Sequence, residues 1–289
     1  MSLSAALKTA TLAPVALAAG LTIGVVIGYV ALRHRSGVEP ALRAEVPRAP
    51  AIPAHPSRDF RTAYTIRTTE TVEIVSNGDW SRPSTGGAIE GRAPNPVAAE
   101  KLAAYIEEWL RLLPDELLTT MQLDRFLVCS QLSFAGELRN AVPIFDTVEL
   151  AYDVELVMLG PSFARHVFFH ELYHMIDWLD DYQLDVDWAW ARSNPAGTKY
   201  GEGGAASRKA PAFHRPRPGF VSWYAGSAIE EDKAELFAVL MTQPRRLSTR
   251  MEKDPVLQAK VALLKKRLKD YCSACDDAWW TRIVAAEKN

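Results

Sequence analysis

The sequence has 289 residues, of which 48% are hydrophobic, and its 33 basic and 35 acidic residues give a formal net charge of −2. We therefore expect no nucleic-acid partner, because such proteins are typically basic. Three cysteines are an odd number, so at least one is unpaired or pairs between chains. The length suffices for one globular domain with a substantial core and additional terminal segments.

Residues 10–32 form a run of 23 residues without a charged side chain. As a helix, this run is long enough to cross a hydrocarbon core of about 30 Å. A cleavable signal peptide is the alternative, because residues 16–18 mimic a small-residue cleavage site, but the apolar run continues far beyond them. We therefore expect residues 1–35 to form a single-pass membrane anchor, which makes the membrane itself a partner of the chain.

The expected anchor carries a possible dimer contact and a weak orientation signal. Three glycines recur in it at a spacing of four residues: Gly20, Gly24 and Gly28. This spacing lets two membrane helices approach closely, although glycine is also simply tolerated in such helices. Lys8 precedes the run whereas Arg33 and Arg35 follow it, which favours a cytoplasmic location for the rest of the chain by a small margin. The membrane face therefore stays open.

Residues 36–60 predict a semi-extended linker. They contain little that could form a core but five prolines: Pro40, Pro47, Pro50, Pro53 and Pro56. The remaining residues, 61–289, have the length of one domain.

The periodicity of this domain predicts an α+β fold. Alternation of polar and apolar residues predicts a strand over residues 64–75, and an amphipathic helix follows at 96–113. Residues 125–134 and 147–159 are strand-like and precede a helix that begins near Pro161. Residues 178–220 show no sustained period, as expected of a binding wall or lid.

The helix after Pro161 contains the motif HExxH at residues 170–174. Side chains four residues apart share a helix face, so His170 and His174 can bind one metal ion while Glu171 stands beside it. This is the zinc-hydrolase arrangement, in which the glutamate takes a proton from water. His166 shares the face, but it is about 12 Å of helix away from His174 and can act only outside the ligand set.

A catalytic zinc site of this kind needs a third protein ligand, which we expect in residues 223–240. Glu231 and Glu235 lie one helical turn apart there, about 60 residues after His174. One carboxylate can bind the metal while the other fixes a ligand imidazole through a hydrogen bond. The residues alone leave open which glutamate has which role.

The combination of HExxH, a tyrosine seven residues before a glutamate, and a second glutamate four residues later resembles the gluzincin zinc metallopeptidases. It is most similar to the group with the protease domain of anthrax lethal factor and to bacterial zinc-binding metallopeptidases, over roughly residues 94–280. The resemblance implies a zincin-like fold, in which a small sheet accompanies an active-site helix and C-terminal helices. It also implies one Zn²⁺ per chain, with three ligands: His170, His174 and Glu231.

The resemblance further assigns Glu171 as the general base, Tyr224 as the phenol that stabilises the tetrahedral intermediate, and Glu235 and Asp177 as outer carboxylates. Two departures concern the substrate pocket: Tyr173 replaces a small residue, and the segment between the second histidine and the glutamate is longer.

The C-terminal part predicts two further helices, over residues 255–271 and about 276–287. Between them lies a single CxxC pair, Cys272 and Cys275, which is too small a ligand set for a structural zinc site. The pair forms either a local disulfide or two ordinary thiols.

Together these features predict a membrane-anchored zinc metallopeptidase that hydrolyses peptides or proteins. Two alternatives stay open, because HExxH does not itself specify peptides: a zinc hydrolase of another substrate, and an inactive membrane-anchored binding or scaffold protein.

Overall fold

The computed structural model describes residues 64–67, 73–76, 78–84, 86–123, 125–184, 186–201 and 217–287. The predicted anchor, the proline-rich linker and the Gly20, Gly24 and Gly28 face lie outside the described residues. Among the described residues, no helix combines the length and the apolar character that a membrane span requires.

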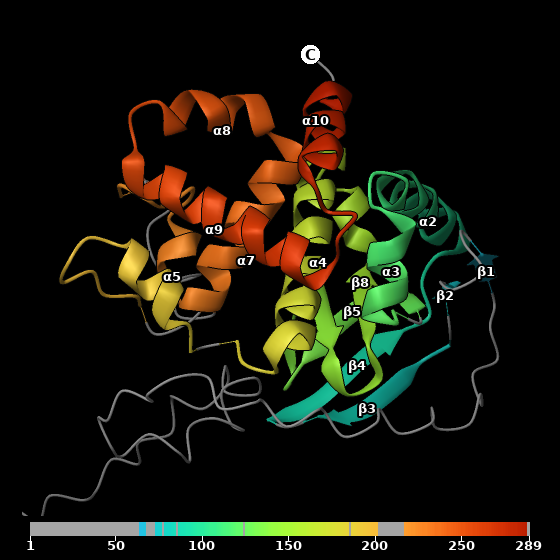
Figure 1. Cartoon of the computed structure of the whole chain (residues 1–289). Helices are drawn as coiled ribbons and strands as arrows, with labels where there is room; N and C mark the ends of the chain where they lie inside the picture. The colour runs from blue at the N-terminus through green and yellow to red at the C-terminus, as the bar shows by residue number, and fades with distance from the viewer. Residues whose placement is uncertain are drawn as a thin grey trace, which may run out of the picture.

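The described strands form one mixed sheet built around a long central strand, β5 (Figure 1). The strands are β1 (Tyr64–Arg67), β2 (Glu73–Ser76), β3 (Trp80–Ser84), β4 (Gly87–Arg92), β5 (Arg125–Phe134), β6 (Glu137–Leu138), β7 (Ala141–Ile144) and β8 (Glu149–Asp153). The first half of β5 pairs in parallel with β2 and β8, and its second half pairs antiparallel with β4 and β6. Gln131 marks the change with a left-handed backbone, at φ 50°, beside a register shift in β4.

The helices lie on one side of this sheet and continue away from it. They are α2 (Pro96–Leu110), α3 (Asp115–Met121), α4 (Pro161–Asp181), α5 (Trp188–Ser193), α7 (Ile229–Thr242), α8 (Pro244–Met251), α9 (Pro255–Tyr271) and α10 (Asp277–Ala286). Helix α4 contacts β7 and α2 on one side and α7 on the other, and α7 in turn contacts α8 and α9 (Figure 1). The centre of the molecule is therefore α4.

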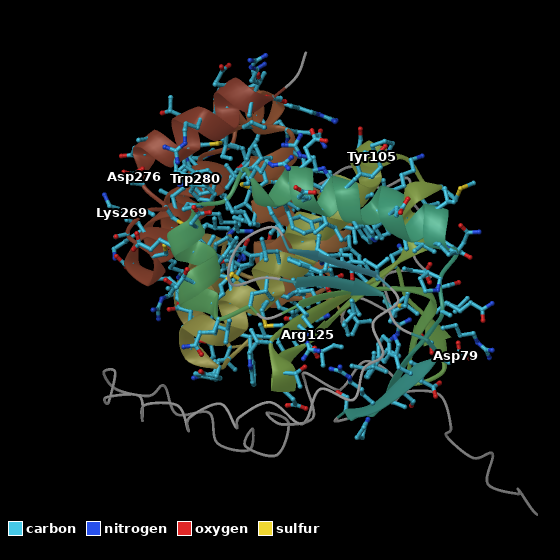
Figure 2. The ribbon with its side chains drawn as sticks, turned by 90° about the vertical axis from the view of Figure 1, so that its right-hand side faces the viewer. Asp79, Tyr105, Arg125, Lys269, Asp276 and Trp280 are labelled. Atoms are coloured by element: carbon cyan, nitrogen blue, oxygen red, sulfur yellow. The ribbon has the colours of Figure 1, made fainter. Side chains whose placement is uncertain are left out.

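Aromatic residues explain why α4 is buried on opposite sides. The ring of Phe168 lies 5.3 Å from that of Trp109 on α2 and 5.6 Å from that of Phe126 on β5. One residue later, Phe169 turns to Phe237 of α7, at 6.2 Å. Phe237 also contacts Trp280 of α10, at 6.5 Å, and Figure 2 shows Trp280 among the side chains of the C-terminal helices. Two apolar faces leave a third face of α4 for the histidines.

The α+β class and the helix start at Pro161 are confirmed, as is the strand over residues 125–134. The single strand predicted over residues 64–75 is wrong: β1 and β2 are two antiparallel strands, with Tyr64 opposite Ser76. Alternation is the same on both strands of such a pair, so periodicity does not reveal where the chain reverses.

The strand predicted over residues 147–159 is shorter than expected. It is β8, and the chain then enters a 3-10 turn, η2 (Val154–Val157). The Asp153 side chain accepts a hydrogen bond from the backbone nitrogen of Glu155 at 2.8 Å, which caps the turn and ends the strand. The helix predicted over residues 96–113 ends at Leu110.

Candidate metal centre

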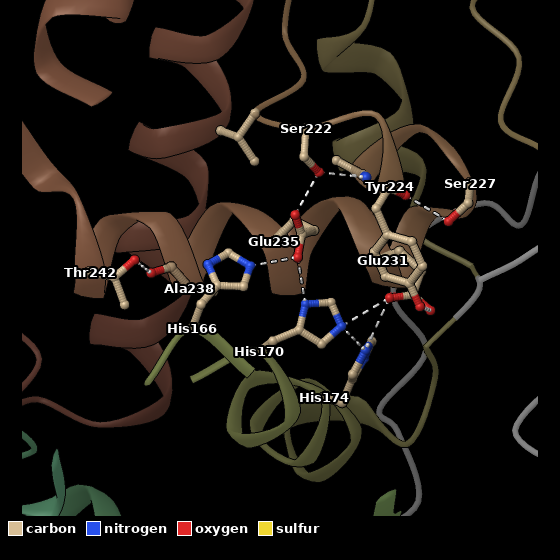
Figure 3. Close-up of polar contacts among 12 residues, drawn as sticks. His166, His170, His174, Ser222, Tyr224, Ser227, Glu231, Glu235, Ala238 and Thr242 are labelled. Atoms are coloured by element: carbon tan, nitrogen blue, oxygen red, sulfur yellow. Dashed lines mark hydrogen bonds and ion pairs between the residues drawn. The ribbon is translucent and has the colours of Figure 1, made fainter. Parts of the chain in front are cut away.

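Helix α4 brings two imidazoles together on its third face. His170 and His174 are 6% and 8% exposed, and their Nε2 atoms lie 3.1 Å apart (Figure 3). The spacing of four residues produces this approach, because it corresponds to about one helical turn. Two ring nitrogens thus point at the same place.

Helix α7 adds a carboxylate at that place. Oε2 of Glu231 lies 3.0 Å from Nε2 of His170 and 3.4 Å from Nε2 of His174 (Figure 3). Glu231 sits in the first turn of α7, where acidic side chains are stabilised by the positive end of the helix dipole. Its buried Oε2 atom has no hydrogen-bond partner in the described structure.

The contact of His170 Nδ1 determines whether Nε2 of the same ring can bind a metal. Nδ1 lies 3.0 Å from Oε1 of Glu235, and only a proton on Nδ1 makes this contact a hydrogen bond. In the neutral ring, Nε2 therefore carries a lone pair that faces Glu231 and His174. Lone pairs and a carboxylate that converge in this way repel one another unless a cation lies between them.

The pKa values of the site agree with this need for positive charge. Burial alone lowers the pKa of His170, but its interactions with the carboxylates of Glu231 and Glu235 outweigh burial and raise the pKa well above its usual range. Burial alone raises the pKa of Glu231, but the imidazoles of His170 and His174 lower it below its usual range. Both shifts have the same cause, which is the close approach of the imidazoles to the carboxylates. Two imidazoles and one carboxylate fit a zinc ion with one open position.

A second group of possible metal donors shares His170 with the first. His166, His170 and Glu235 each offer a donor atom within 4.8 Å of the others. Here, however, Oε1 of Glu235 already lies 2.8 Å from His166 Nε2 and 3.0 Å from His170 Nδ1. Its other oxygen, Oε2, accepts a hydrogen bond from the hydroxyl of Ser222 at 2.5 Å. Because these contacts satisfy Glu235 and no hydrogen bond satisfies Oε2 of Glu231, the group with Glu231 fits a metal better.

Tyr224 lies at the same site. It begins a 3-10 turn, η3 (Tyr224–Gly226), and its hydroxyl donates to Oε1 of Glu231 at 2.9 Å. Its ring centroid lies 5.7 Å from that of His170. The phenol is therefore next to the candidate ligands, where it can donate to an oxygen that becomes negative.

The remaining predicted residues lie on α4. Glu171 follows His170 directly and is partly buried. Asp177 is buried, and its Oδ2 lies 2.5 Å from Nζ of Lys233 on α7. Lys233 also approaches Asp187, at 3.7 Å, so Asp177 belongs to a buried charge network between α4 and α7.

Sequence analysis missed a second buried network that begins at Asp232, the neighbour of Glu231. Oδ2 of Asp232 accepts from Trp190 Nε1 at 2.8 Å, Tyr200 hydroxyl at 2.7 Å and Lys260 Nζ at 2.6 Å. Lys260 also donates to the carbonyl of Gly219 at 2.8 Å. This network fixes the start of α7 against α5 and α9. An acidic run on a helix looks solvated in sequence, so nothing in the pattern indicated it.

Comparisons with known proteins add little to this geometry. No protein-family profile matches the sequence, and no curated protein is significantly similar to it. The structure is similar to the crystal structure of a "putative zinc-binding metallo-peptidase" from Bacteroides caccae, with a TM-score of 0.43 and 20% identity, over 65% of this chain and 74% of that chain. Similarity at this level establishes neither a shared family nor a shared activity.

Proposed function

We propose that the chain is a zinc-dependent metallopeptidase, held at a membrane by its N-terminal segment, that hydrolyses peptide bonds. One observation carries the proposal: His170, His174 and Glu231 converge on one point, and the hydroxyl of Tyr224 lies against Glu231. The ligand set leaves one position open, which distinguishes a catalytic zinc site from a structural one.

A zinc ion bound there would supply Lewis acidity, which polarises a carbonyl group and lowers the pKa of water. The side chains divide the remaining work. Glu171 takes the proton of the attacking water and later delivers it to the leaving amine. Tyr224 donates its hydroxyl hydrogen to the oxygen of the tetrahedral intermediate, a contribution of about 3 kcal/mol for one such donor. Glu235 keeps the proton of His170 on Nδ1, so that Nε2 faces the metal.

The decisive experiment compares the purified full-length chain in detergent with Glu171→Gln. Wild-type protein should contain about one zinc per chain by elemental analysis and should cleave members of a peptide library. Glu171→Gln removes the proton acceptor but no ligand, so zinc should remain while turnover falls at least about a hundredfold. Glu155→Gln, an exposed position on η2, serves as the matched control and should behave like wild type.

Each failure has a different meaning. Wild-type protein without zinc would eliminate the metal site. A zinc-loaded wild type that cleaves no peptide would favour a hydrolase of another substrate or a scaffold protein. Normal cleavage by Glu171→Gln would show that Glu171 is not the base.

A further inference from the structure

Ser222 lies between the candidate metal site and the turn that carries Tyr224. Its hydroxyl donates to Oε2 of Glu235 at 2.5 Å and accepts the backbone N–H of Ala225 at 3.0 Å (Figure 3). One hydroxyl therefore donates to the carboxylate that orients His170 and accepts from the backbone of η3.

The segment around Ser222 is fixed on both sides. Upstream, Arg250 of α8 donates to the carbonyls of Phe220 at 2.7 Å and Val221 at 2.9 Å. Downstream, Ser227 closes the turn by donating to the carbonyl of Tyr224 at 2.7 Å. Ser222 and Tyr224 therefore lie on one backbone segment that is held at both ends.

The two oxygens of Glu235 have different partners, and this difference sets the orientation of the carboxylate. Oε1 contacts the rings of His166 and His170, whereas Oε2 accepts a hydrogen bond from the hydroxyl of Ser222. Without that hydroxyl, Oε2 loses the contact that holds it, the carboxylate is fixed by Oε1 alone, and the hydrogen bond to His170 becomes less well oriented.

We propose that Ser222 is a positioning residue that couples the metal site to Tyr224: through Glu235 it orients the ligand His170, and through Ala225 it places the turn of the phenol. This inference rests on the proposed function, because it assumes that His170 binds zinc. It adds a residue whose hydroxyl sets metal affinity although it lies outside the ligand set.

Zinc affinity, measured by competition with a chelator on the full-length chain, tests the coupling without any substrate. Ser222→Ala should bind zinc about tenfold more weakly, at the lower end of the effect of outer partners of metal ligands. Ser222→Thr keeps the hydroxyl and should restore most of the affinity. Ser227→Ala is the comparison variant, because it loosens the same turn without contacting Glu235, and its zinc affinity should stay clearly above that of Ser222→Ala.

A double-mutant cycle separates positioning from general destabilisation. In a Glu235→Ala background the hydrogen-bond partner of Ser222 is absent, so adding Ser222→Ala should change zinc affinity by less than about twofold. On a cleaved peptide, Ser222→Ala should lower kcat more than it raises KM, and this loss should shrink when Tyr224→Phe is already present. Circular dichroism of each variant verifies the fold.

The results also separate this inference from the proposed function. Wild-type protein that binds no zinc overturns both. If wild type binds zinc and Ser222→Ala binds it equally well, only the coupling is overturned. An equal loss of affinity in Ser222→Ala and Ser227→Ala overturns it as well, because it would reflect the stability of the turn alone.

Discussion

Replacing Lys260 should weaken the fold strongly without touching the candidate ligands. Its ammonium group is 2.6 Å from Oδ2 of Asp232 and 2.8 Å from the carbonyl of Gly219, and both charged side chains are almost fully buried, at 0% and 1% exposed. In Lys260→Met a side chain of similar length keeps the packing but removes the charge. Asp232 is then left buried without its cation.

Breaking a buried ion pair in this way costs about 3–5 kcal/mol. For a domain of this size, each kcal/mol lowers Tm by about 2–4 °C, so the loss should be about 6–20 °C. Lys260→Met combined with Asp232→Asn should recover part of it, because no unpaired charge remains. Thermal and urea unfolding followed by tryptophan fluorescence measure both values.

The matched control lies on the same helix. Lys266 forms an exposed ion pair with Asp270 on α9, and Lys266→Met should cost less than about 1 kcal/mol. A Lys260→Met protein whose stability also falls by less than about 1 kcal/mol would refute the reasoning, since it would show that water or a rearranged donor compensates Asp232.

Three further predictions concern the metal and the thiols. Glu231→Ala should lose zinc, whereas Glu235→Ala should bind it about 10–100-fold more weakly, and the reverse order in zinc titrations would exchange the roles of the two glutamates. In free zinc at 100 times the Kd, the bound metal should add about 2.7 kcal/mol to the free energy of unfolding, so removing it with a chelator should lower Tm by about 5–11 °C. An unchanged Tm would contradict a bound metal. The thiols of Cys129, Cys272 and Cys275 are free and buried, so in the reduced protein a thiol reagent should modify them only after denaturant is added. Fast labelling of the native protein would contradict this burial.

The parts of the site that sequence predicts are those that depend on local geometry. The approach of His170 to His174 follows from helix periodicity, and the start of α4 follows from Pro161. Which role each of the two glutamates has, Glu231 or Glu235, does not follow from local geometry. Both lie one turn apart on α7, and only the tertiary position of α7 against α4 decides which faces Nε2 and which faces Nδ1 of His170.

Other features have no local signal at all. Ser222 looks like an ordinary loop serine until α7 brings Glu235 to it, and Lys260 looks like a solvated helix lysine until α9 packs on α7. Long-range contacts of this kind depend on the complete fold, which periodicity does not encode. The β3–β4 hairpin and helix α3 were not predicted for another reason: both are short local elements, and periodicity is a weak signal over so few residues.

The separation of the candidate ligands along the chain has a consequence for fragments of this protein. The histidines belong to α4 and Glu231 belongs to α7, about 60 residues later, so a metal held by all three acts as a cross-link that closes a long loop. In an unfolded chain the two ends of such a loop are rarely close, and bringing them together lowers the entropy of the chain. In the native protein the fold already holds them together, so zinc binding does not require this loss of entropy. A synthetic peptide that spans α4 alone should therefore bind zinc far more weakly than the intact chain. Tight zinc binding would then report that α4 and α7 have packed against each other.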